Sequence, residues 1–113
     1  MHEVTVAQGI IDVVVERCRA SGFAKVHAVH VTIGVLSSVM PDALRFSFDA
    51  VARGTPVEGA ALVIREVAAE AHCEDCEAYF AARSRVATCP RCKGVRCVVR
   101  GGDELRVSAL EVD

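Results

Sequence analysis

The chain has 113 residues, enough for one compact domain or for one small domain with a metal-stapled module. Hydrophobic residues make up 52%, which is sufficient for a core, but only 4% are aromatic, so the core must be largely aliphatic. The formal net charge of −2 argues against a dedicated nucleic-acid binder, and no apolar run is long enough to predict a membrane-spanning segment.

The first half of the chain predicts a helix, a strand and a second helix. Apolar residues recur at helical spacing over 4–19, and residues 25–34 alternate in the manner of a strand. Pro41 is well placed to begin the second helix, because the first helical position needs no backbone N–H. The Gly-Thr-Pro sequence that starts at Gly54 closes this helix.

The second half predicts two further strands, over 60–67 and 104–112, with a cysteine-rich module between them. In the last strand the apolar phase changes between Val107 and Leu110, which indicates a β-bulge near Ser108 and Ala109. The predicted fold class is therefore α+β. We expect two helices packed on a small three-stranded sheet, with an inserted four-cysteine domain that resembles a zinc ribbon.

Two C-x-x-C pairs in this module predict a metal site. Each pair forms a tight turn that aims two sulfurs at one point, and zinc is the usual occupant of such a tetrahedral set. Two disulfides, or iron in a rubredoxin-like site, are the alternatives. The chain opens without a secretory signal, so we expect a reducing, cytoplasmic setting, which disfavours disulfides. The four cysteines are Cys73, Cys76, Cys89 and Cys92.

A second metal site is predicted at the first three residues. The amine of Met1, the next two amide nitrogens and the imidazole of His2 can offer four nitrogen donors. Such a planar set suits Ni²⁺ or Cu²⁺, and Glu3 can add an oxygen ligand or support the histidine. Taken alone, the motif favours a solvated, frayed terminus over a metal site.

Several motifs along the whole chain together resemble the HypA/HybF family of hydrogenase-maturation nickel metallochaperones. The combination of an initial Met-His-Glu with two C-x-x-C pairs is the distinctive part of this resemblance. The other segments that carry it are Phe46-Ser47-Phe48, Gly54-Thr55, Glu58-Gly59-Ala60 with Leu62, Gly102-Asp103-Glu104-Leu105 and Leu110-Glu111-Val112.

The resemblance implies a nickel-binding α/β domain over 1–70 and 101–113, and a zinc-binding domain over 71–100 inserted between the second and third strands. It implies that His2 is the essential nickel ligand, that Glu3 supports it, and that the four cysteines hold structural Zn(II). Ni(II) would be transferred cargo, delivered to the large subunit of [NiFe]-hydrogenase with a HypB-type GTPase. Some members of the family also serve urease. The sequence leaves open whether the protein forms a homodimer.

Other functions are less well supported. No catalytic motif or phosphate-binding loop appears, so we do not expect an enzyme. A thiol redox protein is a weak alternative, because thiols bound to zinc serve as metal ligands. The main alternative is a zinc-ribbon module that binds proteins or nucleic acid through basic residues. These are Arg83, Arg85, Arg91, Lys93, Arg96 and Arg100.

The remaining cysteines and histidines are predicted to be structural. Cys18 is expected as a buried apolar residue, Cys97 as packed in the ribbon, and His72 as an exposed loop residue. His27 and His30 are expected to be ordinary sheet residues. Asp42 is predicted to favour the dipole of the second helix, with an approach to the N-terminal metal as an alternative.

Overall fold

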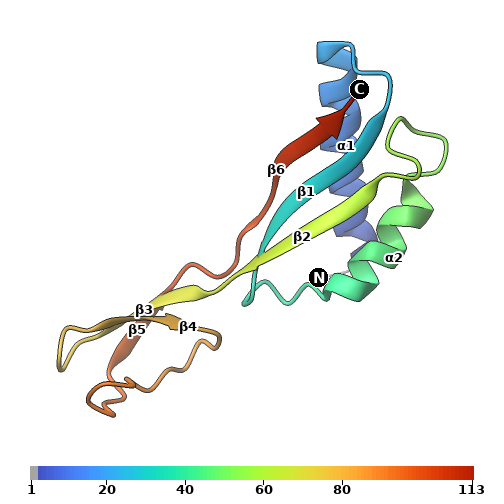
Figure 1. Cartoon of the computed structure of the whole chain (residues 1–113). Helices are drawn as coiled ribbons and strands as arrows, with labels where there is room; N and C mark the ends of the chain where they lie inside the picture. Colours follow the sequence, from blue (N-terminus) through green and yellow to red (C-terminus); the bar gives the residue numbers. More distant parts are fainter. Residues whose placement is uncertain (1–2) are drawn as a thin grey trace. The chain divides into compact units, whose positions relative to one another are not determined.

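A computed structural model describes residues 3–113 (Figure 1). This part of the chain contains two helices and six strands, in agreement with the predicted α+β class. The helices and the three longer strands lie where the sequence predicted them, whereas the three short strands of the cysteine-rich module were not predicted. The elements are α1 Glu3–Ser21, β1 Val26–Gly34, α2 Pro41–Val51, β2 Ala61–Val67, β3 Ala69–Cys73, β4 Tyr79–Ala82, β5 Cys97–Arg100 and β6 Leu105–Val112.

The chain divides into two compact units. The first unit comprises the chain up to Thr32, Val39–Arg65 and Arg106–Asp113, and the second comprises Ile33–Ser38 and Glu66–Leu105. The segment 71–100 therefore lies within the second unit, together with a short stretch from the first half of the chain. No helix within 3–113 is both long and apolar enough to cross a membrane.

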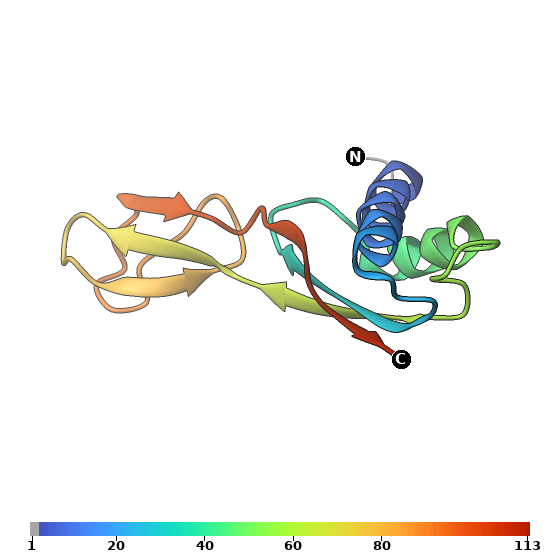
Figure 2. The same ribbon diagram turned by 90° about the horizontal axis from the view of Figure 1, so that it is seen from above.

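In the first unit, α1 and α2 lie on the same face of a sheet with the strand order β2-β1-β6 (Figure 2). Most of the predicted apolar stripe of α1 is buried, but Val4, its first predicted member, is exposed, and Val6 is buried instead. Helix α2 contributes Leu44 and Phe48, both fully buried. Burial of each large side chain stabilises the fold by roughly 1.5–3 kcal/mol. Other buried residues of this core are Val6, Ile10, Ile11, Val14, Cys18, Val26, Val29, Val31, Val57 and Leu62.

Strand β6 shows the predicted change of phase. Val107, Leu110 and Val112 are half-buried, whereas the residues between them are exposed. On the neighbouring strand, His30 Nε2 lies 2.6 Å from Glu111 Oε2, and His27 Nε2 lies 2.5 Å from Asp113 Oδ1. His30 thus pairs with a carboxylate of β6, and His27 pairs with Asp113, the residue that follows this strand. The bulge itself stays a prediction.

The second unit has a small sheet with the strand order β4-β3-β5, antiparallel throughout. Its apolar core is built around three buried alanines, Ala69, Ala71 and Ala82. Leu36, Phe80, Ala87 and Val99 pack against them and are only partly buried. A core of this size buries little apolar surface, so the unit needs another source of stability.

Candidate metal centre

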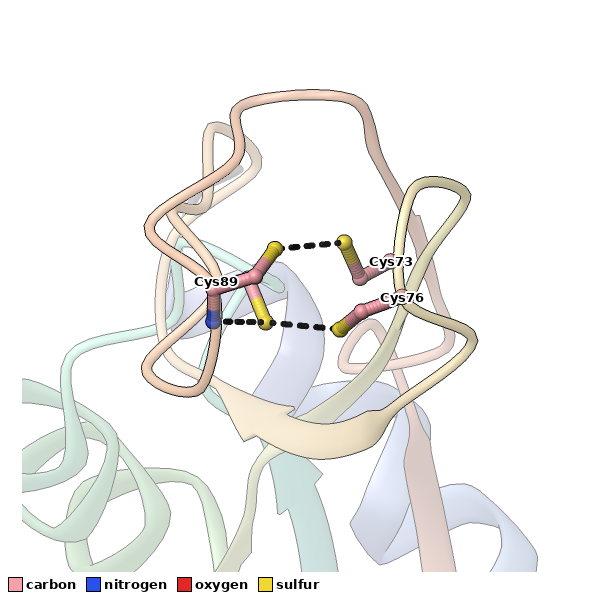
Figure 3. A group of neighbouring side chains, drawn as sticks. Cys73, Cys76 and Cys89 are labelled. Atoms are coloured by element: carbon pink, nitrogen blue, oxygen red, sulfur yellow. Dashed lines mark hydrogen bonds between the residues drawn. The ribbon is translucent and has the colours of Figure 1, made fainter.

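The four sulfurs of the two C-x-x-C pairs converge on one point. The sulfurs of Cys73, Cys76, Cys89 and Cys92 all lie within 4.8 Å of one another. Cys73 ends β3, Cys76 lies in the turn that follows, and the second pair lies in the loop between β4 and β5. Figure 3 shows the labelled side chains of Cys73 and Cys76 pointing toward that of Cys89. None of the described cysteines is in a disulfide.

Both turns have the same backbone geometry. In the first turn the N–H of Glu77 donates to the carbonyl oxygen of Cys73 at 2.9 Å, and in the second the N–H of Lys93 donates to that of Cys89 at 2.9 Å. Glu77 and Lys93 both have φ near 65°. This left-handed conformation is unfavourable for a side-chain-bearing residue, so it marks a turn that the surrounding structure imposes.

Backbone N–H groups in the second turn point at sulfur. The N–H of Cys92 donates to Cys89 Sγ at 3.4 Å, and the N–H of Gly94 donates to Cys92 Sγ at 3.3 Å. A Cβ on Gly94 would lie only 2.8 Å from an oxygen of Asp75 and 3.1 Å from the sulfur of Cys92. A side chain at position 94 would therefore displace the Asp75 carboxylate and crowd the Cys92 sulfur.

The four thiols differ in how readily they lose a proton. The N–H groups of Cys92 and then of Arg91 lower the pKa of Cys89 to about 6. At Cys92 the N–H of Gly94 lowers the pKa, but the Cys73 sulfur and burial outweigh it and raise the pKa to about 12. Four thiolates so close together repel one another, and a cation at their centre would relieve this repulsion.

The donor set fits Zn²⁺. With Zn–S bonds of about 2.3 Å, the sulfurs of a tetrahedral site lie about 3.8 Å apart. The distances from Cys73 Sγ to Cys92 Sγ and from Cys76 Sγ to Cys89 Sγ are both 3.6 Å. Soft thiolate ligands and N–H donors to sulfur are typical of structural zinc sites, and four cysteines complete the coordination.

Two further residues adjoin this group without belonging to it. Cys97 lies directly opposite Cys73 on the neighbouring strand, and its Sγ lies 3.8 Å from the carbonyl oxygen of Gly94. His72 lies in β3, so its prediction as an exposed loop residue was wrong; the strand extends this far because it pairs with both β4 and β5. His72 contacts Glu77 at 2.9 Å and stacks on Tyr79.

Three of the six basic residues named above contact groups of their own unit. Arg96 lies 2.9 Å from Asp75, Arg83 lies 3.8 Å from Glu66, and Arg85 donates to the carbonyl oxygen of Leu36. These contacts involve half of the basic side chains that the nucleic-acid alternative requires. They do not favour a surface arranged to bind phosphates.

Of the predicted nickel residues, Met1 and His2 lie outside the described residues, and Glu3 lies at the start of α1. The Oε2 atom of Glu3 accepts a long hydrogen bond of 3.4 Å from the N–H of Met40, the residue that precedes α2. The start of α1 therefore lies beside the start of α2, an arrangement that the alternative role of Asp42 required. The contact between Glu3 and Met40 itself was not predicted, because it joins residues far apart in the chain. Asp42 is exposed and pairs with Arg45 at 3.3 Å.

Comparison with known proteins decides the family. A family model described as "Hydrogenase/urease nickel incorporation, metallochaperone, hypA" matches residues 1–112. The chain belongs to the HypA family. The resemblance inferred from the sequence motifs is thereby confirmed, and the family consists of metallochaperones rather than enzymes.

Curated HypA relatives match the chain over its whole length. The hydrogenase maturation factor HypA of Rhodobacter capsulatus is 45% identical over 112 residues and covers 99% of both chains. That of Azotobacter chroococcum mcd 1 is 45% identical over 113 residues and covers both chains completely.

Solved HypA structures share the fold. The solution structure of the Ni metallochaperone HypA from Helicobacter pylori has a TM-score of 0.68 and 25% identity, and the match covers 99% of this chain and 97% of that one. A second solution structure of a HypA protein has a TM-score of 0.70 and 24% identity, and the match covers 99% of this chain and 96% of that one. At this identity the match supports the fold alone.

Proposed function

We propose that this chain binds Ni(II) at its N-terminus and delivers it to the large subunit of a [NiFe]-hydrogenase during maturation, while four cysteines hold a structural Zn(II). The observation that carries the proposal is the match of residues 1–112 to a family described by nickel incorporation. The same description names urease as well as hydrogenase, so urease is the second candidate acceptor.

In this proposal, nickel belongs to the domain formed by 1–70 and 101–113. The ligands are the amine of Met1, nearby main-chain nitrogen and the imidazole of His2, and Glu3 supports them. Four nitrogen donors in a plane favour Ni²⁺ over zinc, which has no preference for that geometry. The hydrogen bond that Glu3 accepts from the N–H of Met40 supports its role, because this contact restrains the carboxylate at the start of α1.

The zinc-binding domain, 71–100, has a structural role in the proposal. The three buried alanines at its centre supply little hydrophobic stabilisation, and a bound metal would supply the rest. The N–H donors at the sulfurs of Cys89 and Cys92 support thiolate ligands. Zinc would stay in place while nickel is passed on, since a closed four-cysteine site offers no open position for ligand exchange.

Delivery requires a partner to approach the N-terminus. Val4 is 59% exposed and Phe46 is 79% exposed, and both line a shallow pocket that also includes Glu3. An exposed apolar surface beside the cargo site supports docking of a protein partner there. We propose a HypB-type GTPase and the hydrogenase large subunit as partners in the cytoplasm, with no role for a membrane or for nucleic acid.

Nickel titration of three forms of the protein tests this function. The untagged protein should bind Ni²⁺, a form with a tag fused before Met1 should bind it more weakly, and His2→Ala should lose specific binding. Zinc content should be the same in all three, because the cysteine site is separate. His27→Ala is the matched control, since it removes an exposed histidine that pairs with Asp113. Equal nickel affinity in all forms would overturn the N-terminal site.

A further inference from the structure

Cys97 is a fifth cysteine of the second unit, and it lies beside the group of four without belonging to it. Its Sγ lies 3.8 Å from the carbonyl oxygen of Gly94, the residue whose N–H donates to Cys92 Sγ. Its side chain is half-buried, and its thiol is free. A zinc ion held by the other four cysteines would leave this thiol available for reaction.

Cys97 and Cys73 are direct partners across the antiparallel strands β5 and β3. The N–H of Cys73 donates to the carbonyl oxygen of Ala78 at 2.9 Å, so it is not engaged with β5. In the next pair along the strands, the N–H of Glu74 donates to the carbonyl oxygen of Arg96 at 2.8 Å. Hydrogen-bonded and non-hydrogen-bonded pairs alternate in an antiparallel ladder, so the two cysteines form a non-hydrogen-bonded pair.

A non-hydrogen-bonded pair has the separation that a disulfide needs. Its Cα atoms lie about 4.5 Å apart, and its two side chains stand on the same face of the sheet. Disulfides join cysteines whose Cα atoms are about 4.4–6.8 Å apart. A bond between the sulfurs of Cys73 and Cys97 would therefore require neither a change of register nor a separation of the strands.

Other pairs of sulfurs also lie close together, but each of those pairs consists of two metal ligands. The sulfurs of Cys73 and Cys92 are 3.6 Å apart, as are those of Cys76 and Cys89. A disulfide between two ligands removes two thiolates from the metal centre at once. A disulfide between Cys73 and Cys97 removes only one, so it sacrifices less of the energy of metal binding. This difference favours Cys97 as the first partner of an oxidised ligand.

We propose that hydrogen peroxide joins Cys73 and Cys97 in a reversible disulfide, which takes Cys73 out of the zinc site. The Cys73 thiolate attacks one oxygen of the peroxide, the O–O bond breaks, and hydroxide leaves. The Cys97 thiol then attacks the sulfenic acid sulfur of Cys73, and the S–O bond breaks. The thiol proton leaves with the hydroxyl group as water. The two sulfurs lose two electrons, and the peroxide gains them.

The disulfide would leave three thiolates at the metal centre. Zinc affinity should then fall by about tenfold or more, since the loss of even a residue that only supports a ligand has that effect. A thiol reductant should restore both the fourth ligand and the affinity, because a partly exposed disulfide is open to thiol exchange. The bond itself depends on the pairing of β3 with β5, whereas its effect on zinc rests on the four-cysteine site proposed above. Nickel binding is not involved.

Disulfide mapping of the full, untagged, zinc-loaded protein tests the proposal. The zinc content of the reduced protein is measured first, which separates a failure of the zinc site from a failure of the disulfide. The protein is then treated with an equimolar amount of hydrogen peroxide, and its free thiols are alkylated. Trypsin with a glutamate-specific protease cuts between all the cysteines of the module, so mass spectrometry identifies each linked pair. The main product should link Cys73 to Cys97, and competition with a chelator should show the loss of zinc affinity.

Two variants are the controls. Cys18→Ala removes a buried cysteine of the first unit and should form the same linked product. Cys97→Ser/Val98→Cys moves the thiol to the opposite face of β5 and should not form it, because side chains alternate along a strand. The proposal is overturned by a main product that joins two of the four ligands, by a Cys97 that stays reduced, or by an equal yield in the shifted variant. Unchanged zinc affinity in the linked protein equally overturns it.

Discussion

Gly34 and Gly102 lie with their backbones in direct contact. A Cβ on Gly34 would lie 2.1 Å from both the carbonyl carbon and the carbonyl oxygen of Gly102. The N–H of Leu36 donates to the same oxygen at 2.5 Å, and the N–H of Gly34 donates to Glu104 at 2.7 Å. This crossing ties the segment 33–38 to the chain that leaves the cysteine module.

Gly34→Ala should therefore destabilise the protein by about 3 kcal/mol or more, because neither backbone can move away without losing these hydrogen bonds. Urea unfolding of the zinc-loaded protein measures the effect. Gly9→Ala in α1 is the matched control: a Cβ there meets nothing within 4 Å, and alanine should stabilise the helix by about 0.5–1 kcal/mol. Equal stability of the two variants would contradict the close approach of the Gly34 and Gly102 backbones.

The purified protein should hold one zinc per chain. Cys76→Ala should release it and loosen the second unit, because the alanine core cannot hold that unit without metal. Metal analysis and amide hydrogen exchange measure the two effects. Cys97→Ser should keep its zinc, since Cys97 lies outside the group of four sulfurs. Full zinc in Cys76→Ala would show that the site is not structural.

The left-handed residue of the second turn predicts an unusual order of zinc affinities. Lys93 has φ of 65°, which glycine adopts freely and a β-branched residue does not. Lys93→Gly should bind zinc as tightly as the original protein or more tightly. Lys93→Val should be about 1–2 kcal/mol weaker, or roughly tenfold. Competition with a chelator of known zinc affinity gives the order, and a stronger site in Lys93→Val than in Lys93→Gly would be inconsistent with this turn.

Zinc binding should release protons and become stronger as the pH rises. At pH 7 the Cys89 thiol, with a pKa of about 6, is mostly ionised, whereas Cys92, with a pKa of about 12, keeps its proton until a metal displaces it. Binding therefore consumes no proton and releases at least that of Cys92. As the pH falls below about 6, Cys89 also protonates, and zinc should be lost. Calorimetry in buffers of different ionisation enthalpy counts the protons, and an affinity independent of pH would contradict this account.

Local patterns in the sequence were sufficient to predict the two helices, the three longer strands and the group of four cysteines. The apolar spacing of α1 and the alternation of β1 are properties of neighbouring residues, and two C-x-x-C pairs bring four sulfurs together in almost any fold that closes the loop. The strands β3, β4 and β5 could not be predicted in this way. They have four or five residues each, and pairing between distant segments stabilises them. The contact of Glu3 with Met40 is long-range for the same reason.

Because 33–38 belongs to the second unit, the cysteine module cannot be cut out of the chain as one continuous, complete segment. A fragment cut at Glu66 and Leu105 would lack Leu36, which packs against the three alanines and accepts a hydrogen bond from Arg85. Gly102 would lose the backbone that lies against it. A graft of this module into another protein would therefore have to include a second, separate stretch of chain. The same restriction applies to natural recombination of the module with other domains.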